Sequence, residues 1–310
     1  MSKLVGVVFI AALSVLAACG EKKPSADTGA LPANHGGGDP AAQPMTTNDP
    51  VDTTPLANVD VSKLDADHQK LFYKMVSTLS SPCGKAQSLR ASFTTDTSCR
   101  RAPFAIRYVI MLLGDDAGED DVVKAYAAKY KPADGPPAKF DVSKAPHAGP
   151  EDAPIRFVEF FDYACPHCQR FYPMMQQILK DEAGKAVTYY LMFPLEQVHG
   201  HENSRSAAQA SLAANAQGKF EDMHALLFQK APDHDRAAVS GYAKELGLDT
   251  AKFEKDYDAM NAQVTADEKQ GETAGVNSTP TIYFNDRKYD GPIAVKYIEA
   301  WIDEELAVNR

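Results

Sequence analysis

The first structured segment of the chain has the apolar spacing of helices. Between Leu56 and Lys131, apolar residues recur three or four positions apart, which is the period of a helix with one buried face. The expected helices cover residues 64–79, 85–93, 102–113 and 119–130. This pattern predicts a small all-helical domain over residues 56–135, closed by a proline- and glycine-rich stretch at 132–137.

The second half of the chain alternates between strand and helix patterns. Residues 155–161 form a largely apolar run interrupted by Glu159, as expected of a strand buried on both faces. The apolar residues that follow this run have the spacing of a helix. The remaining predicted segments are a strand at 187–193, an almost wholly helical block at 202–274, a strand at 281–284 and a helix at 293–306. The predicted fold class is therefore α/β, with a helical block inserted between strands and a small helical domain in front.

The N-terminal residues show neither pattern. Residues 1–18 contain Lys3 and an apolar stretch of about fifteen residues, which is short for a membrane-spanning helix and typical of a signal peptide. The stretch ends in Leu-Ala-Ala-Cys, which resembles a bacterial lipobox and implies lipid on the sulfur of Cys19. A plain secretory signal is the alternative. Residues 19–55 are rich in Pro, Gly, Ala and Thr, so we expect a disordered tether.

Composition and charge narrow the class of protein. The net charge of the 310 residues is −10 and no basic patch occurs, which argues against a nucleic-acid partner.

An exported chain faces an oxidising compartment, where disulfides persist. We expect the protein at the periplasmic face of the cell envelope, with the lipid on Cys19 as its contact with the membrane. Gly20 in the next position weakly favours the outer membrane.

The motif Cys165-Pro166-His167-Cys168 lies where the buried strand gives way to a helix. A helix N-terminus presents unpaired N–H groups and a positive dipole end, and both favour a thiolate over a thiol. Pro166 suits the first helical turn, and His167 can add a charge or a hydrogen bond. Because the thiolate is the nucleophile in disulfide exchange, we expect Cys165 to attack and Cys168, one turn later, to be the buried resolving thiol.

Other uses of this motif are less favoured. A structural disulfide across two residues of a helix is strained. A zinc site needs a second closely spaced cysteine pair, and the chain has no other Cys-x-x-Cys, so no metal is expected. Haem attachment requires His directly after the second cysteine, and that residue is Gln169.

The sequence VEFFDYACPHCQRFYP resembles the active site of the DsbA family of periplasmic disulfide oxidoreductases. The resemblance covers roughly residues 140–308 and implies a DsbA-like thioredoxin fold over residues 139–310. It also implies that Thr279 and Pro280 form a cis-proline loop against the cysteines and pair with a client peptide. Glu159 matches the family acid beneath the cysteines, which shuttles the proton of the buried thiol. No cofactor is expected besides the redox-active disulfide.

The five cysteines leave one further pair, because Cys19 is assigned to the lipid. Cys83 and Cys99 would close a loop in the helical domain, and such a bridge contributes about 3 kcal/mol in the chain-entropy model. We expect a structural disulfide there. A second redox relay is the alternative.

Four other ionisable residues have weaker expectations. Asp162 is expected to be a satisfied surface carboxylate, with sharing of the Glu159 role as the alternative. His199 and His201 lack further metal ligands and are expected to be solvated loop residues. His224 is expected to pack structurally.

The expected function is thiol–disulfide exchange on cysteine-containing exported proteins. The oxidase direction is favoured by the dipeptide between the cysteines, and the resemblance implies a quinone-linked membrane oxidoreductase of the DsbB or vitamin-K-epoxide-reductase-like type as partner. Thr279, commoner in reductase and isomerase branches of the family, keeps those directions open. The rival from another class is a non-catalytic binding or chaperone lipoprotein of the envelope.

Overall fold

The structure, a computed structural model, describes residues 51–132 and 136–309. The predicted signal peptide, the lipidation of Cys19 and most of the tether fall outside these residues. Among the residues described, no helix combines the length and apolar character needed to cross a membrane.

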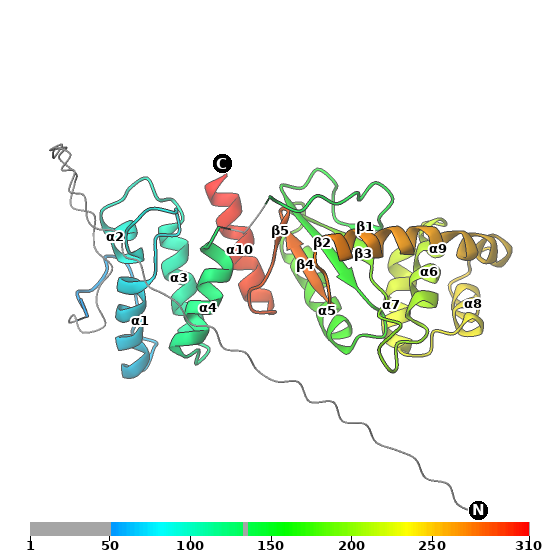
Figure 1. The fold of residues 1–310 in the computed structure, drawn as a ribbon, viewed down its shortest axis with the longest axis horizontal. Coiled ribbons are helices and arrows are strands. Elements are labelled where there is room, and N and C mark those ends of the chain that lie inside the picture. The colour runs from blue at the N-terminus through cyan, green and yellow to red at the C-terminus, as the bar shows by residue number, and fades with distance from the viewer. Residues whose placement is uncertain (1–50, 133–135, 310) are drawn as a thin grey trace, which may run out of the picture. The chain divides into compact units, whose positions relative to one another are not determined.

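The N-terminal segment of the described chain is helical (Figure 1). Its helices are α1 (Ala66–Thr78), α2 (Leu89–Thr94), α3 (Ala102–Leu113) and α4 (Glu119–Tyr130). Side chains cap two of them: Asp65 accepts hydrogen bonds from N–H groups of α1, and Ser88 accepts one from Ala91. Three acidic residues in the first turn of α4 face its positive dipole end.

Helix α2 begins four residues later than the spacing predicted. The backbone before it turns back on itself, since the Ser81 N–H donates to Gln87 O at 2.9 Å and the Leu89 N–H donates to Leu79 O at 2.7 Å. These bonds take up backbone groups that a helix from residue 85 would need, so the helix starts only where Ser88 caps it.

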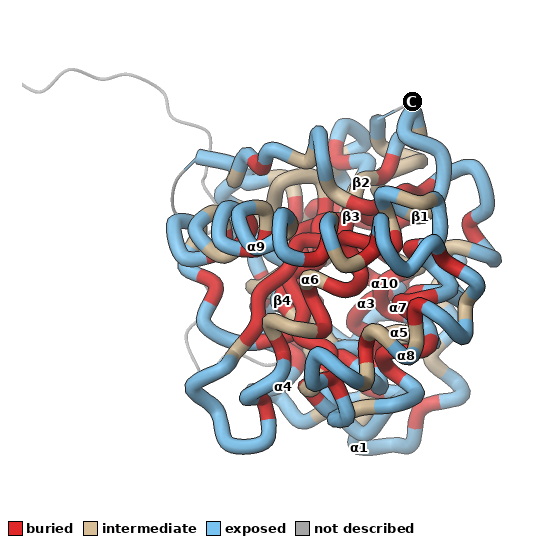
Figure 2. Tube along the Cα trace, turned by 90° about the vertical axis from the view of Figure 1, so that its right-hand side faces the viewer, coloured by how far each residue is buried: buried red, intermediate tan, exposed pale blue. Residues whose placement is uncertain are grey.

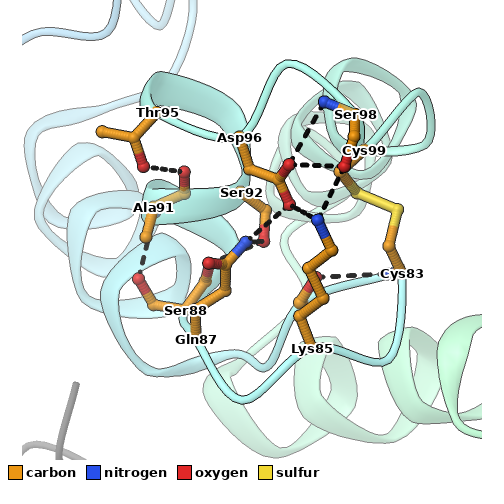
Figure 3. Close-up of polar contacts among 11 residues, drawn as sticks. Cys83, Lys85, Gln87, Ser88, Ala91, Ser92, Thr95, Asp96, Ser98 and Cys99 are labelled. Atoms are coloured by element: carbon orange, nitrogen blue, oxygen red, sulfur yellow. Dashed lines mark hydrogen bonds and ion pairs between the residues drawn. A yellow bond between two sulfur atoms is a disulfide. The ribbon is translucent and has the colours of Figure 1, made fainter. Parts of the chain in front are cut away.

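Figure 3 shows the polar contacts beside this turn. A disulfide joins Cys83 to Cys99, with an S–S distance of 2.02 Å and a Cα–Cα distance of 5.8 Å. The Asp96 carboxylate accepts hydrogen bonds from Gln87 and Ser98 and is paired with Lys85 at 2.7 Å. These interactions hold together the two loops that the disulfide joins.

A five-stranded sheet forms the centre of the remaining chain. Its strands are β1 (His147–Ala148), β2 (Ile155–Phe161), β3 (Ala186–Met192), β4 (Thr281–Phe284) and β5 (Arg287–Lys288), in the order β1-β3-β2-β4-β5. Strands β2 and β3 are parallel, and the other neighbours are antiparallel. Figure 2 shows the central strands as the buried interior.

The helices of this part are α5 (Pro166–Asp181), α6 (Ser204–Asn215), α7 (Phe220–Lys230), α8 (Arg236–Glu245), α9 (Thr250–Thr273) and α10 (Val295–Val308). Helices α6 to α9 lie between β3 and β4 in the sequence and form the expected inserted block. Successive residues of β2 face opposite sides of the sheet: Ile155 and Phe157 join the core that contains α5, and Val158 and Phe160 join the other. Glu159 therefore faces the side that contains α5.

The N-terminal helices pack against α10. Glu304 of α10 is fully buried and forms ion pairs with Lys129 at 3.0 Å and with Arg101 at 2.8 Å. Tyr130 also donates a hydrogen bond to Glu304, at 2.8 Å. Burial lowers the pKa of Lys129 to about 8, against the pull of the Glu304 charge. Apolar residues of α1, α3, α5 and α10 share one core around these contacts.

Candidate active site

The two cysteines of the motif lie at the start of α5, and both are buried. Cys165 is the N-cap residue, in the extended conformation typical of that position, and Pro166 occupies the first turn. The Cys165 N–H donates to Asp162 O at 3.1 Å, which closes the turn between β2 and α5. Both thiols are free; Cys168 is wholly buried, whereas Pro166 and His167 are exposed.

Hydrogen bonding lowers the pKa of the Cys165 thiol from its ordinary value of 9 to about 5. The largest contribution is the Cys168 side chain, whose S–H donates to the Cys165 sulfur. Burial opposes the change, and the Thr279 side chain and the N–H groups of Cys168 and His167 add to it. The orphan N–H groups of the helix N-terminus thus stabilise the thiolate.

The pKa of Cys168 is shifted in the opposite direction. Burial raises the pKa of its thiol well above the ordinary value, and the neighbouring Cys165 and Glu159 charges raise it further. Glu159 is buried in β2, with 3% of its surface exposed, and burial alone raises its pKa to about 8. A carboxyl that is protonated at neutral pH therefore lies close enough to Cys168 to influence its ionisation.

Thr279 and Pro280 lie against Cys165, joined by a cis peptide bond. The Cys165 thiol donates to the Thr279 carbonyl oxygen at 3.3 Å. The Thr279 hydroxyl is buried and has no hydrogen-bond partner among the residues described. Once the thiol loses its proton, the sulfur can accept a hydrogen bond from this hydroxyl, which accounts for the contribution of Thr279 to the lowered pKa of Cys165.

His167 is oriented by its neighbour on α5. The Arg170 guanidinium donates to His167 Nδ1 at 2.9 Å, so this ring nitrogen acts as an acceptor. His167 acts on the pKa of Cys165 through its backbone N–H.

Two expectations from the sequence are wrong. Asp162 was expected at the surface, yet its side chain is fully buried and accepts hydrogen bonds. His201 was expected in solvent, yet it is buried and its Nδ1 lies 2.8 Å from Asp162 Oδ2. The loop after β3 folds over the end of β2 and buries Asp162 and His201. His199, in the same loop, is exposed as expected. The position of Asp162 directly after a buried strand was a signal that the spacing argument overlooked.

His224 packs structurally in an aromatic cluster beside the active-site turn. It is buried, its Nδ1 lies 2.8 Å from the Tyr163 hydroxyl, and burial lowers its pKa to about 3. Phe161, Tyr163 and Phe228 make edge-on or tilted contacts with one another or with this ring. The ring is therefore neutral at physiological pH and fixes the turn through packing.

Two further groups of ionisable or sulfur-bearing residues lie elsewhere. Cys83 and Cys99 belong to a different core cluster from the Cys165–Cys168 pair. Asp65, His68 and Asp116 bring potential metal-ligand atoms within 4.8 Å of one another near the start of α1. His68 Nδ1 is already hydrogen-bonded to Asp65 at 2.8 Å, and Asp65 caps α1, so local structure accounts for this group.

Comparison with known proteins agrees with the fold and the motif. The family model described as thioredoxin matches residues 141–304, just over half of the chain. The chain is 31% identical over 176 residues to disulfide bond formation protein D of Bacillus subtilis (strain 168), a match that covers 52% of this chain and 77% of that protein. It is 34% identical over 148 residues to Na(+)/H(+) antiporter NhaA 1 of Mycobacterium sp. (strain KMS), which covers 46% of this chain and 24% of the antiporter.

Among solved structures, oxidised BdbD from Bacillus subtilis aligns with a TM-score of 0.48 at 27% identity, covering 55% of this chain and 97% of that one. The chain spans about a quarter of the length of the antiporters that it matches. By the family model and the Bacillus relative, the chain belongs to the thioredoxin family, and its motif resembles that of the DsbA-like members.

Proposed function

We propose that this protein catalyses thiol–disulfide exchange on cysteine-containing exported proteins and that it acts as an oxidase. One observation carries the proposal: the two thiols of a single motif have pKa values moved in opposite directions, down to about 5 for Cys165 and well upward for Cys168. A stabilised thiolate beside a buried thiol is the arrangement that disulfide exchange requires.

The oxidase reaction starts from the Cys165–Cys168 disulfide. A client thiolate attacks the Cys165 sulfur, the disulfide of the motif breaks, and Cys168 leaves as a thiolate while a mixed disulfide forms. A second client thiolate then attacks the client sulfur of the mixed disulfide and releases Cys165. The client gains a disulfide, and the motif gains the two electrons. The low pKa of Cys165 makes it a good leaving group in this second step.

Glu159 is proposed as the proton donor and acceptor for Cys168. The departing Cys168 thiolate is buried, where an unpaired charge is costly, and the raised pKa of Glu159 keeps a proton available at neutral pH. When the pair is oxidised again, Glu159 takes the proton back. The quinone-linked membrane oxidoreductase implied by the family resemblance is the proposed oxidant for that step.

Thr279 and Pro280 are proposed to bind the client. Their loop lies against Cys165, and a peptide extended along the Thr279 backbone would have its cysteine next to the Cys165 sulfur. The proposed location is the periplasmic face of the envelope, with the lipid on Cys19 as anchor.

The reduction potential of the Cys165–Cys168 pair tests the direction of the reaction. Strong oxidants of this kind have potentials of about −120 mV, whereas thioredoxin is near −270 mV. Equilibration with glutathione buffers should give a value towards the oxidising end. A value below about −220 mV would reject the oxidase assignment and favour the reductase.

Variants of the motif test the activity itself. Cys165→Ser should abolish exchange with a dithiol peptide. Cys168→Ser, given a client that already carries a disulfide, should accumulate mixed disulfides, because Cys168 can no longer attack the Cys165 sulfur and release the client. A Cys83→Ala, Cys99→Ala double variant is the matched control, since it removes the other cysteine pair, and it should retain exchange. Wild-type protein without thiol-dependent turnover at any redox potential would leave the non-catalytic binding lipoprotein as the better explanation.

A further inference from the structure

The Asp162 carboxylate is the most heavily hydrogen-bonded acid next to the active-site turn. Its side chain is fully buried, and it accepts hydrogen bonds from Ala164 N at 2.7 Å, Leu195 N at 2.8 Å, Ser204 Oγ at 2.6 Å and His201 Nδ1 at 2.8 Å. A buried carboxylate with this many donors is held in one orientation, because loss of any of them leaves charge unsatisfied.

The donors come from three separate segments. Ala164 belongs to the turn between β2 and α5, Leu195 follows β3, and His201 and Ser204 lie at the start of α6. The negative charge also faces the N-terminal end of α6, where the helix dipole favours it. Asp162 therefore fixes the active-site turn to the sheet and to the inserted helical block.

The backbone of Asp162 contacts both cysteines of the motif. Its carbonyl oxygen accepts from the Cys165 N–H at 3.1 Å. Its backbone also makes a hydrogen bond that favours the charged form of Cys168. The side chain thus helps to fix two successive peptide units, of which one is bonded to the Cys165 backbone and the other acts on Cys168.

We infer that Asp162, locked by Ser204 and His201, is a positioning residue that aims the N–H groups at the start of α5 towards the Cys165 sulfur. The inference rests on the proposed thiol–disulfide exchange for its biological meaning, but the geometry of the turn can be measured without it. Asp162 takes no part in proton transfer, and Glu159 keeps that proposed role.

The direction of the effect separates positioning from simple charge. Removal of a nearby negative charge alone would favour the thiolate and lower the pKa of Cys165. Loosening of the turn would instead move N–H donors away from the Cys165 sulfur, and this would raise the pKa of Cys165. Ser204→Ala leaves the Asp162 charge in place and removes one donor, so it reports positioning alone.

The experiment titrates the Cys165 thiolate by its absorbance near 240 nm in reduced protein. Ser204→Ala should raise the titration midpoint by about half a pH unit and Asp162→Asn by about one, with an exchange rate that falls by up to about tenfold. Ser92→Ala is the control for the first variant, because Ser92 is an equally buried serine in α2. Asp267→Asn is the control for the second, because Asp267 is a buried acid that accepts from Met192 N in β3. Both controls should leave the midpoint unchanged.

The outcomes distinguish the two hypotheses. Folded Ser204→Ala protein with a wild-type midpoint, or a lower midpoint in Asp162→Asn, would overturn the positioning role. If Asp162→Asn does not fold, Ser204→Ala decides the question. If wild-type protein shows no exchange, the proposed function fails, while a raised midpoint in Ser204→Ala would still establish that this network positions the turn.

Discussion

Replacement of Glu159 by Gln should stabilise the folded protein at neutral pH. Burial raises the pKa of this carboxyl from its ordinary value of 4.5 to about 8, so the folded state keeps a proton that the unfolded chain releases. Each pH unit between these values corresponds to about 1.4 kcal/mol. The cost of folding with Glu159 is therefore about 3 kcal/mol at pH 7 and about 5 kcal/mol above pH 8.

The sign of the pH dependence follows from the raised pKa. Below pH 4.5 both states hold the proton, and Glu159 and a neutral Gln are equivalent. As the pH rises from 4.5 to 8, the unfolded wild-type chain loses its proton and gains stability, so the wild-type protein becomes less stable relative to Glu159→Gln. Above pH 8 both states are ionised and the difference between the two proteins becomes constant.

Urea unfolding at a series of pH values, with both proteins reduced, measures this difference. Both proteins retain Cys165, so its contribution to the pH dependence of unfolding cancels in the difference between them. Glu245→Gln, at an exposed position of α8, is the control for the loss of a single carboxylate outside the core. Glu159→Gln should also slow exchange, by a factor of about 100 or more if Glu159 is the proton donor. A stability difference independent of pH would refute the claim that the folded state holds the proton.

Three further predictions concern other parts of the chain. In reduced protein the lowered pKa of Cys165 adds stability that is complete above pH 9 and is lost as the pH falls through about 5. The free energy of unfolding of wild-type protein should therefore rise relative to that of Cys165→Ser as the pH increases from 5 to 9, measured by urea unfolding, and a difference independent of pH would refute the lowered pKa. Replacement of both Cys83 and Cys99 by Ala should lower the free energy of unfolding by about 3 kcal/mol, measured by urea titration. An unchanged free energy would show that the disulfide does not constrain the unfolded chain. Lys129→Met should destabilise by about 3 kcal/mol in thermal unfolding, because the buried Glu304 loses one of its three partners and keeps only Arg101 and Tyr130. Combination with Glu304→Leu should recover part of that loss, because no buried carboxylate then remains, and no recovery would mean that Lys129 contributes through packing instead.

The sequence by itself determined the elements that present the motif. The apolar run at 155–161 became β2 without a shift at either end, and Cys165 became the N-cap of α5 because a buried strand, a turn and a helical pattern follow one another directly. The helices at 102–113 and 119–130 also have the predicted bounds. These features depend on residues close in sequence, where periodicity and capping are sufficient evidence. A buried acid at Glu159 follows from the same local pattern.

Only the tertiary structure decided which distant groups surround the sulfur. Thr279 contacts Cys165 across a separation of 114 residues, and His201 reaches Asp162 across 39. Three of the four hydrogen-bond donors to Asp162 belong to distant segments, namely Leu195, His201 and Ser204, so the local sequence does not identify them. The pairing of Lys129 with Glu304 likewise joins α4 to the last helix. Burial and hydrogen bonding are properties of the packed chain, and in this protein they lower the pKa of Cys165 and of Lys129.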